Sequence, residues 1–130
     1  MNNFIKKYKT HPAKKLIINL TSGAAQSAYD GWGLYCAGKA SVDMISKVAA
    51  IEQDLENSGI KVLSIAPGVV DTEMQTSIRN VDVQGFSRKQ KFIELHENKQ
   101  LYAPEAVAKE FVSIIKHPEK IKDVIHRITL

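Results

Sequence analysis

A tyrosine and a lysine stand four residues apart in the stretch Gly-Trp-Gly-Leu-Tyr-Cys-Ala-Gly-Lys-Ala, residues 31–40. On a helix, Tyr35 and Lys39 would share one face. A phenol has an ordinary pKa of about 10, too high for efficient proton transfer at neutral pH, and a neighbouring ammonium lowers that pKa because it favours the phenolate. The pair therefore predicts a general acid that protonates a carbonyl oxygen. The same spacing is also typical of an amphipathic helix with an exposed lysine, so the surrounding elements must decide.

Three apolar segments predict the strands of a sheet. Residues 15–21 form a short, continuous apolar run rich in isoleucine, which is typical of a strand buried on both faces of a parallel sheet. Residues 60–66 predict a second strand, which Pro67-Gly68 stops, and residues 123–128 predict the last. Residues 22–33, rich in Gly, Ala and Ser, are expected to form a loop.

The remaining segments predict helices. Residues 34–57 are expected to form one long helix, and residues 1–10 are expected to form the tail of another. The polar residues 69–101 predict one or two helices and a mobile connection, and Pro104 opens a further helix at its first turn. The alternation of strands and helices predicts an α/β fold with a parallel sheet. The long helix is indicated by residues near helical spacing: Leu34, Ala37, Ser41, Ile45, Val48, Ile51 and Leu55.

The ends of the predicted strands bring chemical groups together. Ser22 follows the first strand, and the segment Pro67–Thr72 follows the second. Open α/β sheets bind ligands at the carboxyl ends of their parallel strands. We therefore expect Ser22, Tyr35, Lys39 and the segment 67–72 to converge on one site.

Three motifs carry a resemblance to a known family: Asn-Leu-Thr-Ser-Gly at residues 19–23, Tyr-Cys-Ala-Gly-Lys at residues 35–39, and Ala-Pro-Gly-Val-Val-Asp-Thr-Glu-Met at residues 66–74. Through most of residues 15–128 the chain resembles the C-terminal half of a short-chain dehydrogenase/reductase. Within that family it is most similar to the sepiapterin reductase and bacterial benzil reductase branch. The resemblance implies a Rossmann-like parallel sheet, truncated to its C-terminal half, with three strands and covering helices in one domain over residues 1–130.

The resemblance also implies catalytic roles. Ser22 would bind the substrate carbonyl, Tyr35 would donate the proton, and Lys39 would lower the pKa of Tyr35 and bind the nicotinamide ribose. The implied reaction is hydride transfer from NADPH to a ketone, with NAD as the alternative cofactor. The implied substrate-binding residues are Ser22, Gly23, Trp32 and Tyr35.

The segment after the second strand would line the nicotinamide. The backbone of Val70 and the hydroxyl of Thr72 would meet the carboxamide group. The cofactor-binding residues implied here, besides Tyr35 and Lys39, are Pro67, Gly68, Val69, Val70, Asp71 and Thr72.

Each of these residues also has a purely structural interpretation. Ser22 could cap a turn, and Ser27 is a rival that lies too close to Tyr35 for the usual spacing. Thr72 could be a helix N-cap, and Pro67-Gly68 could be an ordinary strand stop. Trp32, with Tyr29, could pack beneath the loop instead of lining a substrate pocket.

The family's phosphate-binding element has no counterpart in these 130 residues. No glycine-rich turn follows a strand and opens a helix, which is the arrangement that binds a dinucleotide pyrophosphate. We therefore expect the N-terminal half of the fold to be absent from this chain. Two functions remain open: an NAD(P)H-dependent carbonyl reductase, and a non-catalytic fragment or dimerisation module derived from one.

Composition limits the other classes of partner. The 18 basic residues are spread among 14 acidic ones, so no clustered basic face favours nucleic acid. One cysteine and four scattered histidines predict no metal site, and no apolar run approaches the length of a membrane span. Without an apolar signal core, the sequence predicts a cytoplasmic protein that acts on a small-molecule carbonyl compound.

Two segments predict self-association. In the family that the chain resembles, the helix expected at residues 34–57 packs across a subunit interface, which implies a homodimer. The strand at residues 15–21 would form a sheet edge with unpaired backbone groups, which invites another chain to pair with it.

Overall fold

The computed structural model of the chain describes residues 1–81 and 86–130. Its helices are α1 (Asn2–Tyr8), α2 (Gly33–Leu55), α3 (Glu73–Asn80), α4 (Lys89–Glu97) and α5 (Pro104–Lys116). Its strands are β1 (Lys15–Leu20), β2 (Ile60–Ala66) and β3 (Ile125–Arg127), and two 3₁₀ turns are η1 (Gly23–Ala25) and η2 (Pro118–Lys120).

These bounds match the sequence-based expectations with two adjustments, in the segments 22–33 and 123–128. The expected loop at 22–33 contains the turn η1, and the last strand is shorter than residues 123–128. The polar segment 69–101 holds two helices, α3 and α4. The mobile connection expected there falls in part on residues 82–85, which lie outside the described residues.

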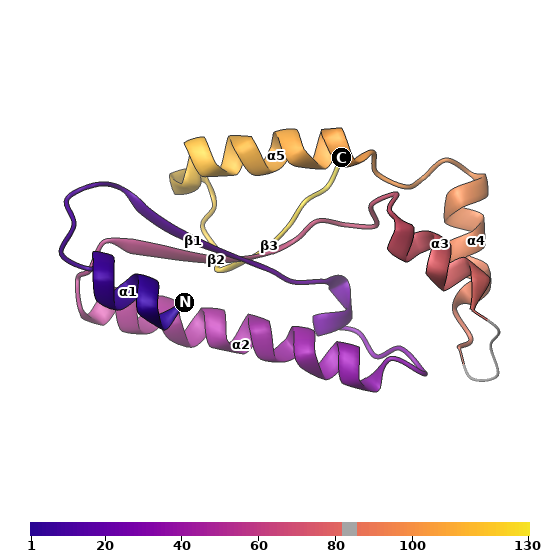
Figure 1. Ribbon diagram of the computed structural model, residues 1–130, viewed down its shortest axis with the longest axis horizontal. Helices are drawn as coiled ribbons and strands as arrows, with labels where there is room; N and C mark the ends of the chain where they lie inside the picture. The colour runs from indigo at the N-terminus through magenta and orange to yellow at the C-terminus, as the bar shows by residue number, and fades with distance from the viewer. Residues whose placement is uncertain (82–85) are drawn as a thin grey trace.

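The three strands form one parallel sheet in the order β1-β2-β3. Helix α2 connects β1 to β2, and helices α3 to α5 connect β2 to β3, because parallel neighbours need long crossovers. Figure 1 shows α5 on one face of the sheet and α2 with α1 on the other. The predicted α/β fold with a Rossmann-like parallel sheet is confirmed.

The alternation of side chains along β2 divides the core into two layers. Leu63 and Ile65 face α5 and pack with Val107, Ile114 and Ile128. The other face of the strand carries Ile60 and Val62, which pack with Ala49 of α2. Because both faces of β2 are buried, apolar residues occur at both alternating sets of positions along the strand.

Helix α2 packs on the sheet through a small and polar face. Its buried residues are Asp43, Ser46, Ala49 and Gln53. Asp43 accepts a hydrogen bond from Ser64 of β2 at 2.7 Å, and Ser46 accepts one from Asn19 of β1 at 2.8 Å. These hydrogen bonds, together with the packing of Ala49 on Ile60 and Val62, fix the helix on the sheet.

The apolar residues that indicated this helix lie on its opposite, exposed side. Leu34 is 94% exposed and Leu55 is 78% exposed. We call this face the α2 stripe; its large exposed residues are Leu34, Met44, Ile45, Val48, Ile51 and Leu55. Helix α2 therefore has two contact faces, one occupied by the sheet and one open.

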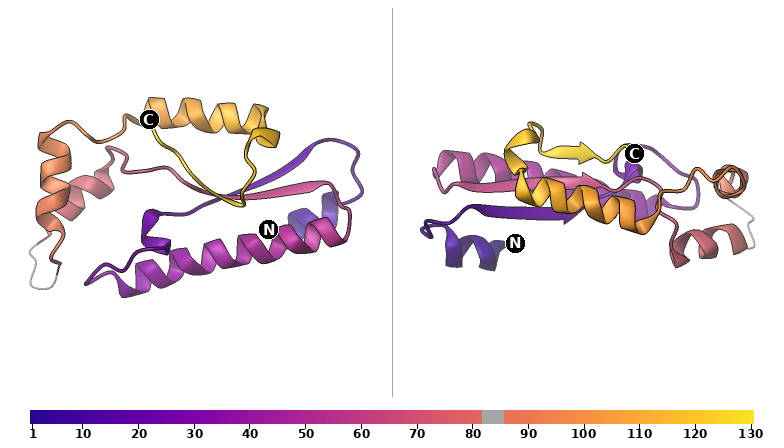
Figure 2. Two further views of the ribbon diagram at one scale, coloured as in Figure 1. Left: turned by 180° about the vertical axis from the view of Figure 1, so that it is seen from behind. Right: turned by 90° about the horizontal axis from the view of Figure 1, so that it is seen from above.

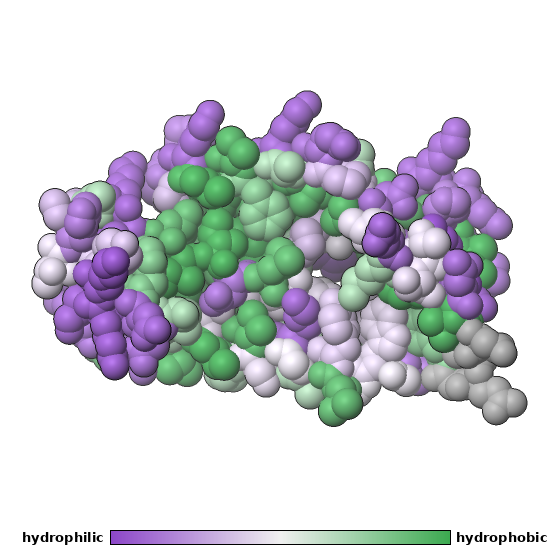
Figure 3. All heavy atoms as spheres, in the orientation of Figure 1, coloured by the Kyte–Doolittle hydropathy of each residue, from purple (hydrophilic) through white to green (hydrophobic). Residues whose placement is uncertain are grey.

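Strand β1 lies at one edge of the sheet, as expected for residues 15–21. It pairs with β2 alone among the described residues, and Figure 2 shows it along the border opposite β3. Leu20 is 54% exposed, and Figure 3 shows apolar side chains gathered on the face between α5 and α2.

No helix in the described part of the chain has the length and apolar character needed to cross a membrane.

Candidate active site

A pocket of about 520 Å³ opens where the three strands end. Ser22 comes two residues after β1, Pro67 directly follows β2, and Arg127 is the last residue of β3. All three line the pocket, and residues of α2 and α3 complete its walls. The carboxyl ends of the strands, where the site was expected, therefore border a cavity.

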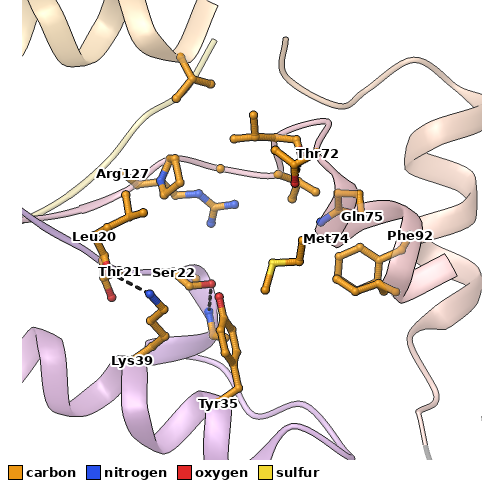
Figure 4. Close-up of a pocket in the computed structure, with 18 of the residues that line it drawn as sticks. Leu20, Thr21, Ser22, Tyr35, Lys39, Thr72, Met74, Gln75, Phe92 and Arg127 are labelled. Atoms are coloured by element: carbon orange, nitrogen blue, oxygen red, sulfur yellow. Dashed lines mark hydrogen bonds between the residues drawn. The ribbon is translucent and has the colours of Figure 1, made fainter. Parts of the chain in front are cut away.

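Tyr35 and Lys39 occupy the first two turns of α2 and both line this pocket. The Nζ of Lys39 lies 5.8 Å from the centre of the Tyr35 ring and donates a hydrogen bond to the carbonyl of Leu20 at 2.9 Å. Figure 4 shows the phenol hydroxyl pointing into the pocket. The shared helix face places the ammonium and the phenol in one site, as their spacing indicated.

Ser22 has the capping role that its position allowed, and it also lines the pocket. It is the N-cap of η1, where its Oγ accepts a hydrogen bond from the backbone N–H of Ala24 at 3.2 Å. That bond uses one lone pair and leaves the hydroxyl proton available to a ligand. The rival Ser27 is exposed and is not among the residues that line the pocket.

The segment after β2 forms another wall. Pro67, Gly68, Val69, Val70 and Thr72 line the pocket, whereas Asp71 is exposed and lies outside its lining.

Gly68 takes a left-handed backbone conformation with φ of 82°. A Cβ there would lie 2.8 Å from Cδ2 of Tyr102 and closer still to Cε2, so only glycine fits beneath that ring. Tyr102 continues the contact through a bridge to Val70. The Pro-Gly pair is therefore more than a strand stop.

Thr72 stands at the N-cap of α3, but its side chain forms no cap hydrogen bond. Its hydroxyl donates instead to the carbonyl of Val70 at 3.4 Å. A bond this long is weak, so the hydroxyl remains available to a ligand in the pocket.

An aromatic cluster closes the side of the pocket near the loop before α2. Trp32 stacks on Phe86 at 4.8 Å and on Tyr29 at 5.4 Å between ring centres, and it meets Tyr35 edge-on at 5.5 Å. Phe92 of α4 joins the cluster at 5.6 Å from Trp32. Trp32 therefore both lines the pocket and packs beneath the loop, so the two sequence-based interpretations are compatible.

A polar contact ties the same loop to the start of α4. Asp30 accepts hydrogen bonds from the backbone N–H and the hydroxyl of Ser87, at 2.6 and 2.8 Å. The backbone bond first, and the hydroxyl second, hold the pKa of Asp30 below its ordinary value of 3.8. Beside it, the guanidinium of Arg88 lies over the Tyr29 ring at 4.5 Å.

Several lining residues were missed by the sequence analysis. They include Met74, Gln75 and Arg127, with Phe92 and Phe111 from more distant segments. Gln75 is 7% exposed, and its Oε1 has no hydrogen-bond partner among the described residues. Arg127 could have been found from its place at the end of the last predicted strand, by the argument that identified Ser22.

No cluster of three His, Cys, Asp or Glu residues within 1–81 and 86–130 is placed to hold a metal ion. Gly23 lines the pocket next to Ser22. The arrangement supplies hydroxyl donors and two cations around a cavity with aromatic walls. It is suited to the transfer of a proton from a hydroxyl to a polar, unsaturated group, with a cation beside the oxyanion that the donor leaves.

The comparisons with known proteins agree with this geometry. The family model of short chain dehydrogenase matches residues 3–82. A benzil reductase ((S)-benzoin forming) of Bacillus cereus is 37% identical over 127 residues, which is 98% of this chain and 51% of that protein. A sepiapterin reductase of Rattus norvegicus is 44% identical over 79 residues, 59% of this chain and 29% of that protein.

Among solved structures, a short chain dehydrogenase/reductase of Saccharomyces cerevisiae superposes with a TM-score of 0.82 at 24% identity. The match covers 97% of this chain and 49% of that one, and it shows a common fold. The chain thus spans about half the length of the benzil reductase and of the yeast enzyme that it matches. Because the family model matches residues 3–82, which is more than half of the chain, the chain belongs to the short chain dehydrogenase family.

Proposed function

We propose that this chain carries the catalytic and substrate-binding side of an NAD(P)H-dependent carbonyl reductase. The observation that carries the proposal is the gathering of Ser22, Tyr35 and Lys39 in one pocket, opposite the segment 67–72. The two curated relatives described above are reductases by name, which agrees with a carbonyl substrate.

The pocket has groups suited to the nicotinamide end of a dinucleotide. Lys39 has three N–H donors and uses one on Leu20, so two remain for ribose hydroxyls. The weakly bonded hydroxyl of Thr72 and the backbone of Val70 would meet the carboxamide, over the half-buried wall of Pro67 to Val70. When bound, the reduced nicotinamide supplies a hydride to carbon. NADPH is the proposed form, and NAD is the alternative.

Tyr35 provides the proton that the carbonyl oxygen needs. Its hydroxyl donates that proton, while the free proton of the Ser22 hydroxyl makes a hydrogen bond to the same oxygen and orients it. Lys39, 5.8 Å from the phenol ring, places a positive charge beside the group that becomes anionic. The product is an alcohol, and the phenolate is reprotonated from water.

The walls of the pocket favour a carbonyl compound with an aromatic or apolar part. Trp32, Tyr29 and Phe92 offer ring faces on one side, and Met74 and Ile78 of α3 offer aliphatic surface on another. Such side chains favour flat apolar groups through area burial and ring stacking.

The Tyr35→Phe variant tests this proposal, because it removes the proton donor and keeps the ring. We expect NADPH-dependent reduction of benzil to fall by a factor of about 10² to 10⁴, which is the range for losing a general acid. Tyr29→Phe is the matched control, since Tyr29 lines the same pocket and contributes its ring to the stack with Trp32. Turnover in Tyr35→Phe at the rate of the unaltered protein would contradict the assignment.

A second function, self-association, is favoured by the open face of α2. Six large apolar residues of the α2 stripe are exposed in a helix whose other face already packs on the sheet. Exposed apolar surface of this kind marks interaction sites. We infer a homodimer through this stripe, with pairing at the edge of β1 as the alternative.

A further inference from the structure

The charged residues that line the pocket are both cations. Lys39 and Arg127 line it, and no Asp or Glu of the described residues does. The two ion pairs within that part of the chain join Lys9 to Glu56 and His117 to Glu119, so Arg127 has no carboxylate partner there. The pocket therefore presents positive charge that the rest of the described chain leaves uncompensated.

The position of Arg127 directs its side chain at the reacting groups. It pairs with Ala66 in the sheet, directly before Pro67, at the carboxyl end of β3. One guanidinium nitrogen lies 3.9 Å from where a Cβ on Gly23 would be, and Gly23 follows Ser22. Figure 4 shows the guanidinium pointing into the pocket, on the side where Ser22 and Tyr35 direct their hydroxyls.

Lys39 and Arg127 differ in the part that each can play in binding a ligand. Lys39 is anchored to the carbonyl of Leu20 and belongs to the proton-donor pair. The guanidinium of Arg127 is a planar fork of N–H donors, which matches a carboxylate with two parallel hydrogen bonds. An anion held there would lie close to Gly23, on the side of the pocket where Ser22 and Tyr35 direct their hydroxyls.

We propose that Arg127 is a specificity-determining residue that binds a carboxylate of the substrate. The inference rests on the proposed function and deepens it: the substrate is a keto acid, with its ketone at Ser22 and Tyr35 and an aromatic or apolar part against Trp32. A phosphate of the cofactor has the same charge, and the experiment separates these two sources of an anion.

Trp32 offers a direct readout of binding. It is the single tryptophan of the chain and it lines the pocket, so quenching of its fluorescence reports ligands there without any turnover. The probes are benzoylformate, an aromatic keto acid, and its methyl ester, which keeps the ring and the ketone but lacks the charge. We expect the acid to bind more tightly than the ester.

The Arg127→Met variant keeps much of the apolar stem and removes the charge. We expect it to weaken benzoylformate binding by about tenfold or more, as for loss of a charge-assisted hydrogen bond, and to leave the ester unchanged. Lys116→Gln, exposed at the end of α5 and outside the pocket, is the charge-matched control and is expected to change neither. An unchanged ratio of acid to ester affinity in Arg127→Met would overturn the proposal.

Further measurements distinguish substrate from cofactor as the source of the anion. They also distinguish failure of the anion site from failure of the proposed reductase function. A loss of NADPH affinity in Arg127→Met that equals its loss of benzoylformate affinity would assign the anion to the cofactor and overturn the proposal. Tyr35→Phe is expected to keep the ratio of benzoylformate to ester affinity, because both ligands carry the ketone that Tyr35 contacts. Charge-dependent binding without reduction of any carbonyl would contradict the proposed function but support the anion site.

Discussion

At the scale of single residues, the pocket depends on one glycine. Gly68 has φ of 82° and lies under the ring of Tyr102, so a Cβ would meet both backbone strain and a clash. We expect Gly68→Ala to lower the free energy of unfolding by about 1 kcal/mol or more, measured by urea denaturation.

Gly38→Ala is the matched control for this change. Gly38 lies inside α2, and nothing lies within 4 Å of the Cβ that the substitution adds. Alanine stabilises a helix interior by up to about 1 kcal/mol relative to glycine. We therefore expect the urea midpoint to rise or stay unchanged. Equal destabilisation by the two variants would contradict the role given to Tyr102.

The same scale shows why one side chain can hold a structural and a chemical role. The Oγ of Ser22 caps the turn η1 as an acceptor, which leaves its proton for a ligand. Trp32 packs between loop and helix while one part of it faces the cavity. The structural and functional interpretations of these residues are therefore not exclusive, because each uses a different part of the side chain.

At the scale of elements, the loop before α2 is held to the start of α4 by Asp30 and Ser87. The folded-state pKa of Asp30 is below its ordinary value of 3.8. The Asp30 carboxylate therefore contributes fully to stability above pH 3.8, and this contribution is lost as the pH falls through the folded-state pKa. We expect Asp30→Asn to lower the urea midpoint at neutral pH, and the difference from the unaltered chain to vanish in acid.

Asp123→Asn provides the control for this series. Asp123 is exposed and precedes β3, at the end of the sheet opposite the pocket. We expect it to leave the neutral-pH midpoint where it is. A midpoint difference for Asp30→Asn that persists unchanged into acid would show that the carboxylate form of Asp30 is not what holds the loop.

Helix α2 shows how an apolar pattern can be read correctly and still leave its packing open. The spacing of Leu34, Ile45, Val48 and their neighbours predicted the helix, and the helix is present. The sheet nevertheless takes the opposite face, where Asp43 and Ser46 find partners in Ser64 and Asn19. Periodicity identifies an amphipathic helix but not which partner its apolar face meets.

At the scale of the whole molecule, two surfaces are left uncovered by the described part of the chain: the α2 stripe and the unpaired edge of β1. We expect the chain to sediment as a dimer, and the double change Val48→Glu and Ile51→Glu to yield monomers, because burying two carboxylates costs far more than an apolar contact gains. Gln90→Glu, exposed on α4, is the charge-adding control. An unchanged assembly in the double variant would exclude the α2 stripe as the interface and favour pairing at β1.

Much of the molecule follows from its sequence. The runs at 15–21 and 60–66, the long helix and the Pro104 start are local patterns, and each appears in the structure within a few residues. Their order implied the parallel sheet, and the motifs around Ser22, Tyr35 and Gly68 implied the family, because each motif sits at the end of an identifiable element.

Only the tertiary structure decided which segments far apart in the chain come into contact. The sequence by itself determined the fold class and the family. It also identified the candidate catalytic residues Ser22, Tyr35 and Lys39, because these depend on short-range spacing and on the ends of strands. The entry of Gln75 into the pocket, the Asp30–Ser87 contact and the buried face of α2 required the packed chain. Such contacts depend on how distant elements fill space together, and no local pattern contains that information.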